Sequence, residues 1–208
     1  MKVEVLNIKG KKTTKTIKLD DNIFNITPND HAIYLDVKSI MANKRQGTHK
    51  AKERGEIQGS RRKIKKQKGT GTARAGDIKN PLFKGGGRVF GPRPRIYKNK
   101  LNKKLKQLAR KSALTYKANE NKIKVVENFS FKEPKTKKMM EIVFNLGLKD
   151  SKTLFILSEK NDNVMLSSKN IKNLQLLEVK NLNTYDILNY KDLVFVDESV
   201  KQVEKKLL

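Results

Sequence analysis

The second half of the chain alternates between short apolar runs and stretches with helical spacing. The runs KIKVVEN, TLFILS, LQLLEV and LVFVD are nearly continuous in apolar residues, as in strands that are buried on both faces of a sheet. Helices are predicted for PKTKKMMEIVFNLG, NVMLSSKN, TYDILN and ESVKQVEKKLL, the first with Pro134 at its first position and Gly147 just past its end. This alternation predicts a largely parallel sheet with helices on both faces.

The first hundred residues contain a predicted strand, a predicted helix and then a long stretch without periodicity. KVEVLNI alternates polar and apolar residues like a half-buried strand, and TIKL is a candidate to pair with it. A helix is predicted over residues 29–43, capped by Asn29 or Asp30, and another follows the aperiodic stretch. The predicted apolar faces of these two helices consist of Ile33, Val37, Ile40 and Met41, and of Leu101, Leu105, Leu108, Ser112 and Tyr116.

The aperiodic stretch divides the chain into two parts of different composition. Residues 1–44 and 99–208 are expected to form one three-layer α/β/α domain, and residues 45–98 a long extended loop inserted after the first helix. We call residues 45–98 the basic loop. Between Lys44 and Lys98 there are 18 Lys and Arg and three acidic residues, so more than half of the net charge of +27 lies there. Ten of the chain's twelve glycines lie in the same stretch.

This composition indicates that the partner of the basic loop is a polyanion. Ordering the loop costs roughly 1–2 kcal/mol per residue in backbone entropy, and its few apolar side chains cannot offset that cost in the free protein. Binding to phosphates can offset that cost, because Lys and Arg release the counterions condensed on a nucleic acid and glycines let main-chain N–H groups approach the phosphates closely. The loop's aromatic residues are only Phe83, Phe90 and Tyr97, which favours phosphates of structured RNA over base stacking. A charged flexible linker is the alternative interpretation.

The glycines of the basic loop do not match a nucleotide-binding motif. A G-x-G-x-x-G fingerprint tried at Gly69 and Gly71 has Arg74 where the third glycine belongs. A P-loop tried from Gly71 to Gly76 continues with Asp-Ile instead of Lys-Ser or Lys-Thr. Neither stretch follows a predicted strand and opens a predicted helix, which both motifs require.

Other classes of function find little support in the residues. His31 and His49 have no spaced partner for a metal or catalytic site, and a chain without Cys has neither disulfides nor thiolate chemistry. No apolar run approaches the roughly 20 residues of a membrane span. The N-terminus lacks the apolar core of a secretory signal. We therefore expect no enzyme, cofactor, metal or membrane association, and a cytoplasmic location.

Several long motifs resemble those of the bacterial large-subunit ribosomal protein four family. These are RQGTHKAKERGEIQGS, KQKGTGTARAG, NPLFKGGGRVFGPRPR and KLNKKLKQLARKSAL, and with PKTK and VKQVEKKL the resemblance covers essentially the whole chain. It implies an α/β domain on the outside of the large subunit and a loop that passes through ribosomal RNA to the nascent-peptide exit tunnel. It also implies a tunnel constriction shared with ribosomal protein twenty-two, and a role early in subunit assembly.

The resemblance also implies which residues contact RNA. Carried over position by position, these are Arg45, Gln46, Gly47, Thr48, Lys50, Arg54, Lys68, Gly69, Thr70, Gly71, Arg74, Lys84, Arg88, Arg93 and Arg95. The crowding of charge adds Arg61, Arg62, Lys63 and Lys66, and Lys103 and Lys104 on the following helix. The expected tunnel tip consists of Arg62, Lys63, Ile64, Lys65, Lys66, Gln67 and Lys68. Within it, Ile64-Lys65 replaces the Pro-Trp or Pro-Tyr pair that is usual in the family.

We expect a structural, non-enzymatic constituent of the large ribosomal subunit, with ribosomal RNA, neighbouring ribosomal proteins and the passing nascent peptide as partners. Two other functions stay open at the level of the sequence. A non-ribosomal RNA-binding or assembly factor would dissociate from mature subunits at high salt, whereas an integral protein would co-sediment with them. An α/β enzyme that uses a nucleotide would be stabilised thermally by nucleotides.

Overall fold

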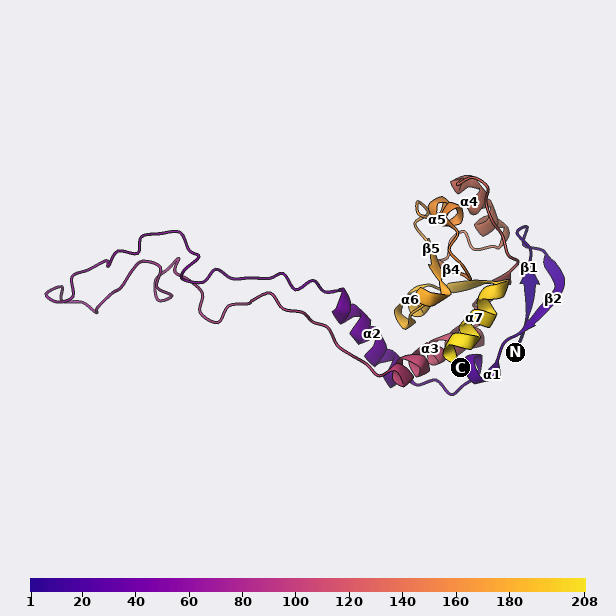
Figure 1. Cartoon of the computed structure of the whole chain (residues 1–208), viewed down its shortest axis with the longest axis horizontal. Helices are drawn as coiled ribbons and strands as arrows, with labels where there is room; N and C mark the ends of the chain where they lie inside the picture. Colours follow the sequence, from indigo (N-terminus) through magenta and orange to yellow (C-terminus); the bar gives the residue numbers. More distant parts are fainter. The chain divides into compact units, whose positions relative to one another are not determined.

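Two compact units make up the computed structural model, which describes all of residues 1–208. Met1–Met41 and Lys100–Leu208 form the first, which we call the α/β unit, and Ala42–Asn99 form the second (Figure 1). The second unit contains the basic loop. It has no helix or strand after the last turn of the helix that ends at Lys44.

The α/β unit is built on a six-stranded sheet with the strand order β2-β1-β3-β6-β4-β5. The strands are β1 (Lys2–Leu6), β2 (Lys12–Lys18), β3 (Ile123–Val126), β4 (Thr153–Leu157), β5 (Leu174–Glu178) and β6 (Asp192–Val196). Every neighbouring pair is parallel except β1 with β2, which is antiparallel. The sheet is therefore mostly parallel, as the apolar runs predicted.

Helices cover both faces of this sheet and complete three layers. They are α1 (Asp21–Phe24), α2 (Asp30–Lys44), α3 (Lys103–Asn119), α4 (Thr136–Asn145), α5 (Asp162–Ser168), α6 (Thr184–Asn189) and α7 (Asp197–Leu207), with a 3-10 turn, η1, at Val179–Asn181. Apolar residues of α1, α3, α6 and α7 pack in one core cluster, and those of α4 and α5 in another. Figure 1 shows the two groups of helices on opposite sides of the strands. None of the helices combines the length and apolar character that a membrane span needs.

The central strand β6 shows why its sequence is apolar at every position from 193 to 196. Leu193 and Phe195 belong to the core cluster on the α7 side, whereas Val194 and Val196 belong to the cluster on the α4 side. Successive side chains of a strand point to opposite faces, so a strand covered on both faces has no position for a polar residue in its middle. All four side chains are 2% exposed or less.

Some predicted details differ from the structure. The short α1 and the turn η1 were not predicted, so the basic loop follows α2, the second helix, and not the first. Helix α4 begins at Thr136, which places Pro134 before the helix and not at its first position. Gly147 does follow the end of α4, with a φ of +69° that glycine adopts without strain.

The predicted apolar faces of α2 and α3 are also displaced. The buried residues of α2 are Ala32, Asp36 and Ser39, and Ala109, Ala113 and Leu114 are among those of α3. Leu114 is fully buried and Ser112 is buried as predicted, whereas the larger apolar residues predicted for the two faces are only half-buried or exposed. The Asn29 side chain accepts a hydrogen bond from the Ala32 N–H, so Asn29 is the predicted cap of α2.

The two helices that flank the basic loop in sequence are hydrogen-bonded to each other within the α/β unit. The Tyr116 hydroxyl of α3 donates to the Asp30 carboxylate of α2 at 2.6 Å, and this bond raises the pKa of Tyr116. The Asn29 N–H donates to the Ser112 hydroxyl at 3.0 Å. The chain thus leaves and re-enters the α/β unit through two helices that are held together.

A buried polar contact fixes α2 against α6. The Thr184 hydroxyl donates to the Asp36 carboxylate at 2.6 Å, and the two residues are 0% and 2% exposed. We predict that Thr184→Val destabilises the protein by about 1–3 kcal/mol, because the buried Asp36 carboxylate loses this donor. Urea unfolding would measure the loss, with Thr14→Val on the exposed face of β2 as the control. Equal stability of the two variants would show that this contact does not hold α2.

Candidate nucleic-acid interface

The basic loop consists of two chain segments joined by backbone hydrogen bonds. No continuous ladder forms, because the bonds are separated by several residues and include turns and bends. In each bond the N–H of the first residue donates to the carbonyl of the second, at 3.0 to 3.2 Å: Arg95 to Gly47, Ala51 to Pro92, Arg88 to Lys52, and Ile64 to Gly76. The two segments come together again at intervals, from the ends of the loop to its tip.

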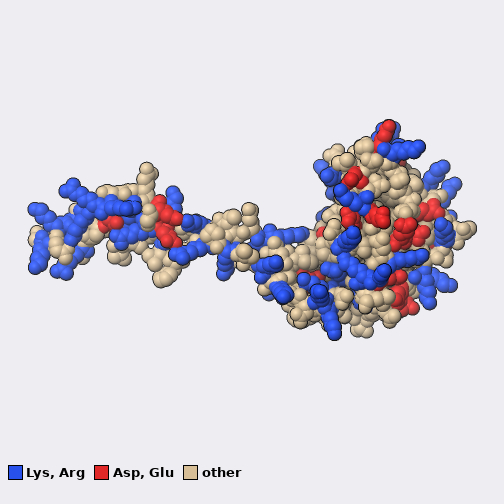
Figure 2. Space-filling model, in the orientation of Figure 1, with Lys and Arg blue, Asp and Glu red and all other residues tan.

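The basic loop has no apolar core of its own. No buried apolar residue lies between Ala32 and Ala109 in the sequence, so residues 45–98 contain none. All side chains from residue 61 to residue 70 are exposed. Figure 2 shows Lys and Arg covering much of this part of the surface, with few acidic side chains among them. The loop therefore lacks the hydrophobic burial that stabilises ordinary domains.

All three acidic residues of the basic loop are paired with cations of the same loop. The pairs are Arg54 with Asp77 and Arg93 with Glu53, each with an N–O distance of 2.7 Å, and Lys50 with Glu56. The hydrogen bond from the Lys50 ammonium lowers the pKa of Glu56. The acids thus hold three cations in place, and the remaining Lys and Arg of the loop have no acidic partner.

Tyr97 holds together the first and last residues of the basic loop. The guanidinium carbons of Arg45 and Arg95 lie 4.0 and 4.6 Å from the centre of its ring, and its hydroxyl is 2.7 Å from His49 Nε2. A Cβ on Gly47, which has a φ of +67°, would lie 2.1 Å from the Arg95 carbonyl oxygen. Glycine at position 47 therefore allows the close crossing that brings both arginines onto the ring.

The tip of the loop displays cations around two glycine turns. Gly69 and Gly71 have φ values of +81° and +63°, and no atom lies within 4 Å of a Cβ placed on either. Their role is therefore the backbone conformation, which leaves main-chain groups open to a ligand. The Lys65 ammonium donates to the Thr72 hydroxyl at 2.9 Å, and Lys63 is hydrogen-bonded to Gln67.

Lys103 and Lys104 add a second basic group, which belongs to the α/β unit. Both are exposed and lie in the first turn of α3, which has no acidic residue and no side-chain cap. The N-terminal end of a helix carries partial positive charge, so two lysines there are unfavourable without an anion. A phosphate would be stabilised by the lysines and by the helix end together.

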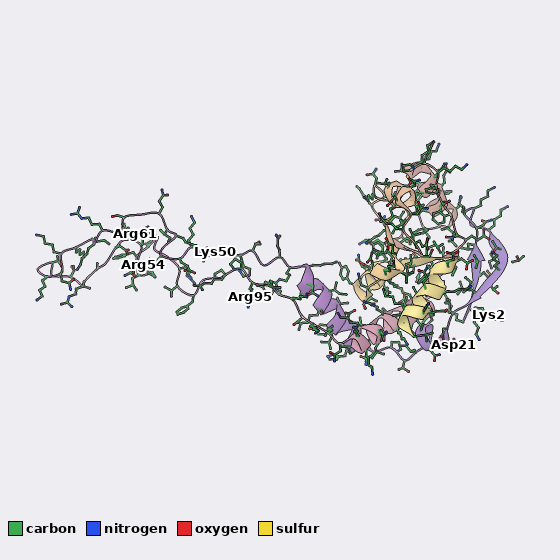
Figure 3. The ribbon with its side chains drawn as sticks, viewed as in Figure 1. Lys2, Asp21, Lys50, Arg54, Arg61 and Arg95 are labelled. Atoms are coloured by element: carbon green, nitrogen blue, oxygen red, sulfur yellow. The ribbon has the colours of Figure 1, made fainter.

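The structure assembles the predicted RNA-contacting residues into two kinds of group. Arg45, Gly47 and Arg95 meet at Tyr97, and Lys50, Arg54 and Arg93 are each paired with an acid. The cations of the tip have no acidic or aromatic partner in common. Figure 3 labels Lys50, Arg54, Arg61 and Arg95. The sequence reasoning missed the positioning roles of Tyr97 and of the three acids. The rarity of acids in a basic stretch was a signal that each would attract a cation, but the sequence did not indicate which one, because Asp77 and Glu53 pair with arginines far away along the chain.

A separate crevice of about 300 Å³ lies at the carboxyl ends of β3, β4 and β6, where open α/β sheets often bind ligands. Lys160 is its cation, and a hydrogen bond to Asp162 raises the pKa of Lys160. Glu159 and Glu198 also line it, which is unfavourable for a nucleotide phosphate. No group of three or more His, Asp or Glu side chains in the chain could hold a metal ion.

Comparison with known proteins gives consistent matches over the full length. A family model described as the ribosomal protein L4/L1 family matches residues 17–206. The chain is 60% identical over 207 residues to the large ribosomal subunit protein uL4 of Christiangramia forsetii, covering 100% of both proteins. It is 59% identical to the uL4 protein of Amoebophilus asiaticus, over 98% of this chain and 97% of that one. The uL4 protein of Flavobacterium psychrophilum is 58% identical, over 100% and 99%.

We predict that proteases attack the basic loop first in the free protein. Without buried apolar side chains, residues 45–98 should open at little cost, so trypsin should cleave there and amide hydrogens should exchange quickly. Mass spectrometry of the fragments would locate the cuts, with the α/β unit as the internal control. Addition of heparin, a polyanion, should slow the cleavage. Uniform protection of the loop without any polyanion would contradict this expectation.

Proposed function

The chain belongs to the ribosomal protein L4/L1 family, and on that premise we propose that its basic loop binds ribosomal RNA within the large subunit. The protein is a structural constituent of the large ribosomal subunit. The α/β unit supplies the folded core, and the loop supplies more than half of the net positive charge.

The main support for this proposal is that the basic loop has a high positive charge and no hydrophobic core. Its acids are already paired inside the loop, so the unpaired cations repel one another unless external anions lie between them. RNA places phosphates at close and regular spacing along its backbone and releases counterions when Lys and Arg replace them. The stacked arginines at Tyr97 add planar donors that suit the oxygens of a phosphate.

We further propose that the tip of the loop lies at the wall of the nascent-peptide exit tunnel, next to ribosomal protein twenty-two, and that the protein joins the subunit early in assembly. The resemblance of the loop motifs supports both points. The tip is suited to such a position, because its side chains are all exposed and its cations are supported mainly by backbone turns. A passing peptide would then meet the tip residues Arg62 to Lys68.

A non-ribosomal RNA-binding or assembly factor is the alternative. Such a factor would release the mature subunit in high salt, whereas a constituent whose loop is surrounded by RNA would stay bound at one copy per subunit. Sedimentation of purified large subunits in increasing salt, followed by quantitative mass spectrometry, separates the two. Loss of this protein before the other integral proteins would favour the factor.

We predict a steep dependence of RNA affinity on salt. If the loop and Lys103 and Lys104 neutralise phosphates, log K for a ribosomal RNA fragment falls linearly with log salt. The double variant Lys103→Gln, Lys104→Gln should flatten that slope by about 1–2, and replacement of residues 45–98 by a short linker should flatten it far more.

The matched control for the salt experiment is Lys137→Gln, Lys138→Gln. These lysines are also exposed in the first turn of a helix, but they lie on α4, which packs on the other face of the sheet. The control should keep the slope of the wild type. An unchanged slope in the protein without its loop would place the RNA site elsewhere.

A second prediction concerns two lysines of the tip. Lys68→Glu should repel adjacent phosphate, displace the tip and alter peptide stalling and macrolide sensitivity in cells. Lys65→Trp removes the bond to Thr72 and restores an aromatic residue where the family usually has one, so it should change the lumen without reducing subunit yield. Subunit profiles and drug sensitivity measure both outcomes. If Lys68→Glu leaves drug response and stalling unchanged while Lys65→Trp blocks assembly, the assignment of wall and lumen residues is wrong.

A further inference from the structure

A three-residue bulge interrupts the pairing of the two segments of the basic loop. The Ala51 N–H donates to the Pro92 carbonyl, and the Arg88 N–H donates to the Lys52 carbonyl, both at 3.0 Å. Ala51 and Lys52 are neighbours on one segment, whereas Arg88 and Pro92 are four positions apart on the other. Residues 89–91 must therefore bow outward between two hydrogen bonds that hold the base of the bulge.

Phe90 stands at the centre of this bulge in an unfavourable conformation. Its φ is +52°, in the left-handed region that bulky side chains avoid, and its side chain is 103% exposed. A Cβ on Gly91 would lie 2.6 Å from the Cβ of Ala51, so the backbone next to Phe90 is pressed against the opposite segment. Both the backbone strain and the exposed ring cost free energy in the free protein, and neither is offset by a contact within the chain.

A hollow of about 250 Å³ adjoins the bulge. The apolar residues Val89, Phe90 and Pro92 line it, together with the charged residues Arg88, Arg93 and Glu53. The ion pair of Arg93 with Glu53, at 2.7 Å, fixes one of these cations at the site. This volume lies just below the range of pockets for drug-sized ligands, which suits a single planar ring system.

Phe90 is the aromatic side chain of the loop that is available for stacking. The Tyr97 ring already lies against the guanidinium groups of Arg45 and Arg95. Phe83 is 36% exposed, about a third of the exposure of Phe90. The small number of aromatic residues in the loop therefore does not argue against base stacking at one position.

We propose that Phe90 and the hollow beside it accept one unpaired RNA base, which stacks on the ring while its phosphates lie near Arg88 and Arg93. The inference rests on the proposed RNA-binding function and adds a base contact to the phosphate contacts. Unstacked bases in loops and bulges of RNA bind aromatic rings and arginine planes in this way. RNA fits better than a protein partner, because the bulge lies in a stretch with 18 basic and only three acidic residues, and RNA supplies closely spaced phosphates beside its bases.

The absence of Trp from the chain allows a direct test. In the full-length variant Phe90→Trp, position 90 holds the sole tryptophan, and its fluorescence should be quenched when a large-subunit ribosomal RNA fragment binds. Heparin, which carries negative charge but no bases, should bind without that quenching. The control is Leu82→Trp, at a residue of the same loop that is 89% exposed but lies outside the bulge. Equal quenching in the two variants, or no quenching of the Phe90→Trp variant in its RNA complex, would overturn the proposal.

Affinity gives an independent measurement. Phe90→Ala should weaken RNA binding on the order of ten- to a hundredfold without changing the salt slope, because it removes stacking and no charge. Phe90→Tyr should bind like the wild type. If Phe90→Ala binds RNA normally with a normal slope, the base contact is wrong and the proposed function stands. If the wild type itself shows no salt-dependent binding, the proposed function fails.

A protein partner at this position would give a different pattern. The fluorescence of Phe90→Trp would then shift to shorter wavelength in intact subunits, as for a buried indole, but would not be quenched by the RNA fragment alone. That result would overturn the base contact and assign the bulge to a protein neighbour.

Discussion

Repulsion among like charges in a segment without a core is the constraint on which the rest of the molecule depends. The stretch from Lys44 to Lys98 carries 18 basic and three acidic residues and buries no apolar side chain. Its three acids neutralise only three of these cations, so the remaining cations repel one another unless external anions lie between them. The α/β unit, with its two apolar clusters, is stable for the ordinary reasons and carries the loop into the assembly.

Polar contacts determine which cations of the loop are held before any RNA is present. Three ion pairs and the Tyr97 cluster hold Arg45, Lys50, Arg54, Arg93 and Arg95. Each of these contacts is at least partly open to solvent and weak alone, so none replaces a hydrophobic core. Their value lies in presenting donors in a limited set of positions, which lowers the entropy lost when RNA binds.

The anchoring of α2 and α3 links this loop to the fold. Asp36 with Thr184 and Asp30 with Tyr116 are contacts between residues that lie far apart in the sequence. They join the helix before the loop to the body of the α/β unit and to the helix after it. The Thr184 hydroxyl offsets part of the cost of burying the Asp36 carboxylate, because it donates to one of the two carboxylate oxygens.

The sequence by itself determined the fold class, the placement of the strands and the concentration of positive charge between residues 44 and 98. These properties follow from local periodicity and from net composition, which neighbouring residues express without tertiary contacts. Tertiary structure alone decided the buried faces of α2 and α3, the pairing of the acids with distant cations, and the position of Phe90 on a bulge. Each of these features depends on which residues come into contact across the sheet or across the loop. The sequence of one segment does not specify which residues of a distant segment lie next to it.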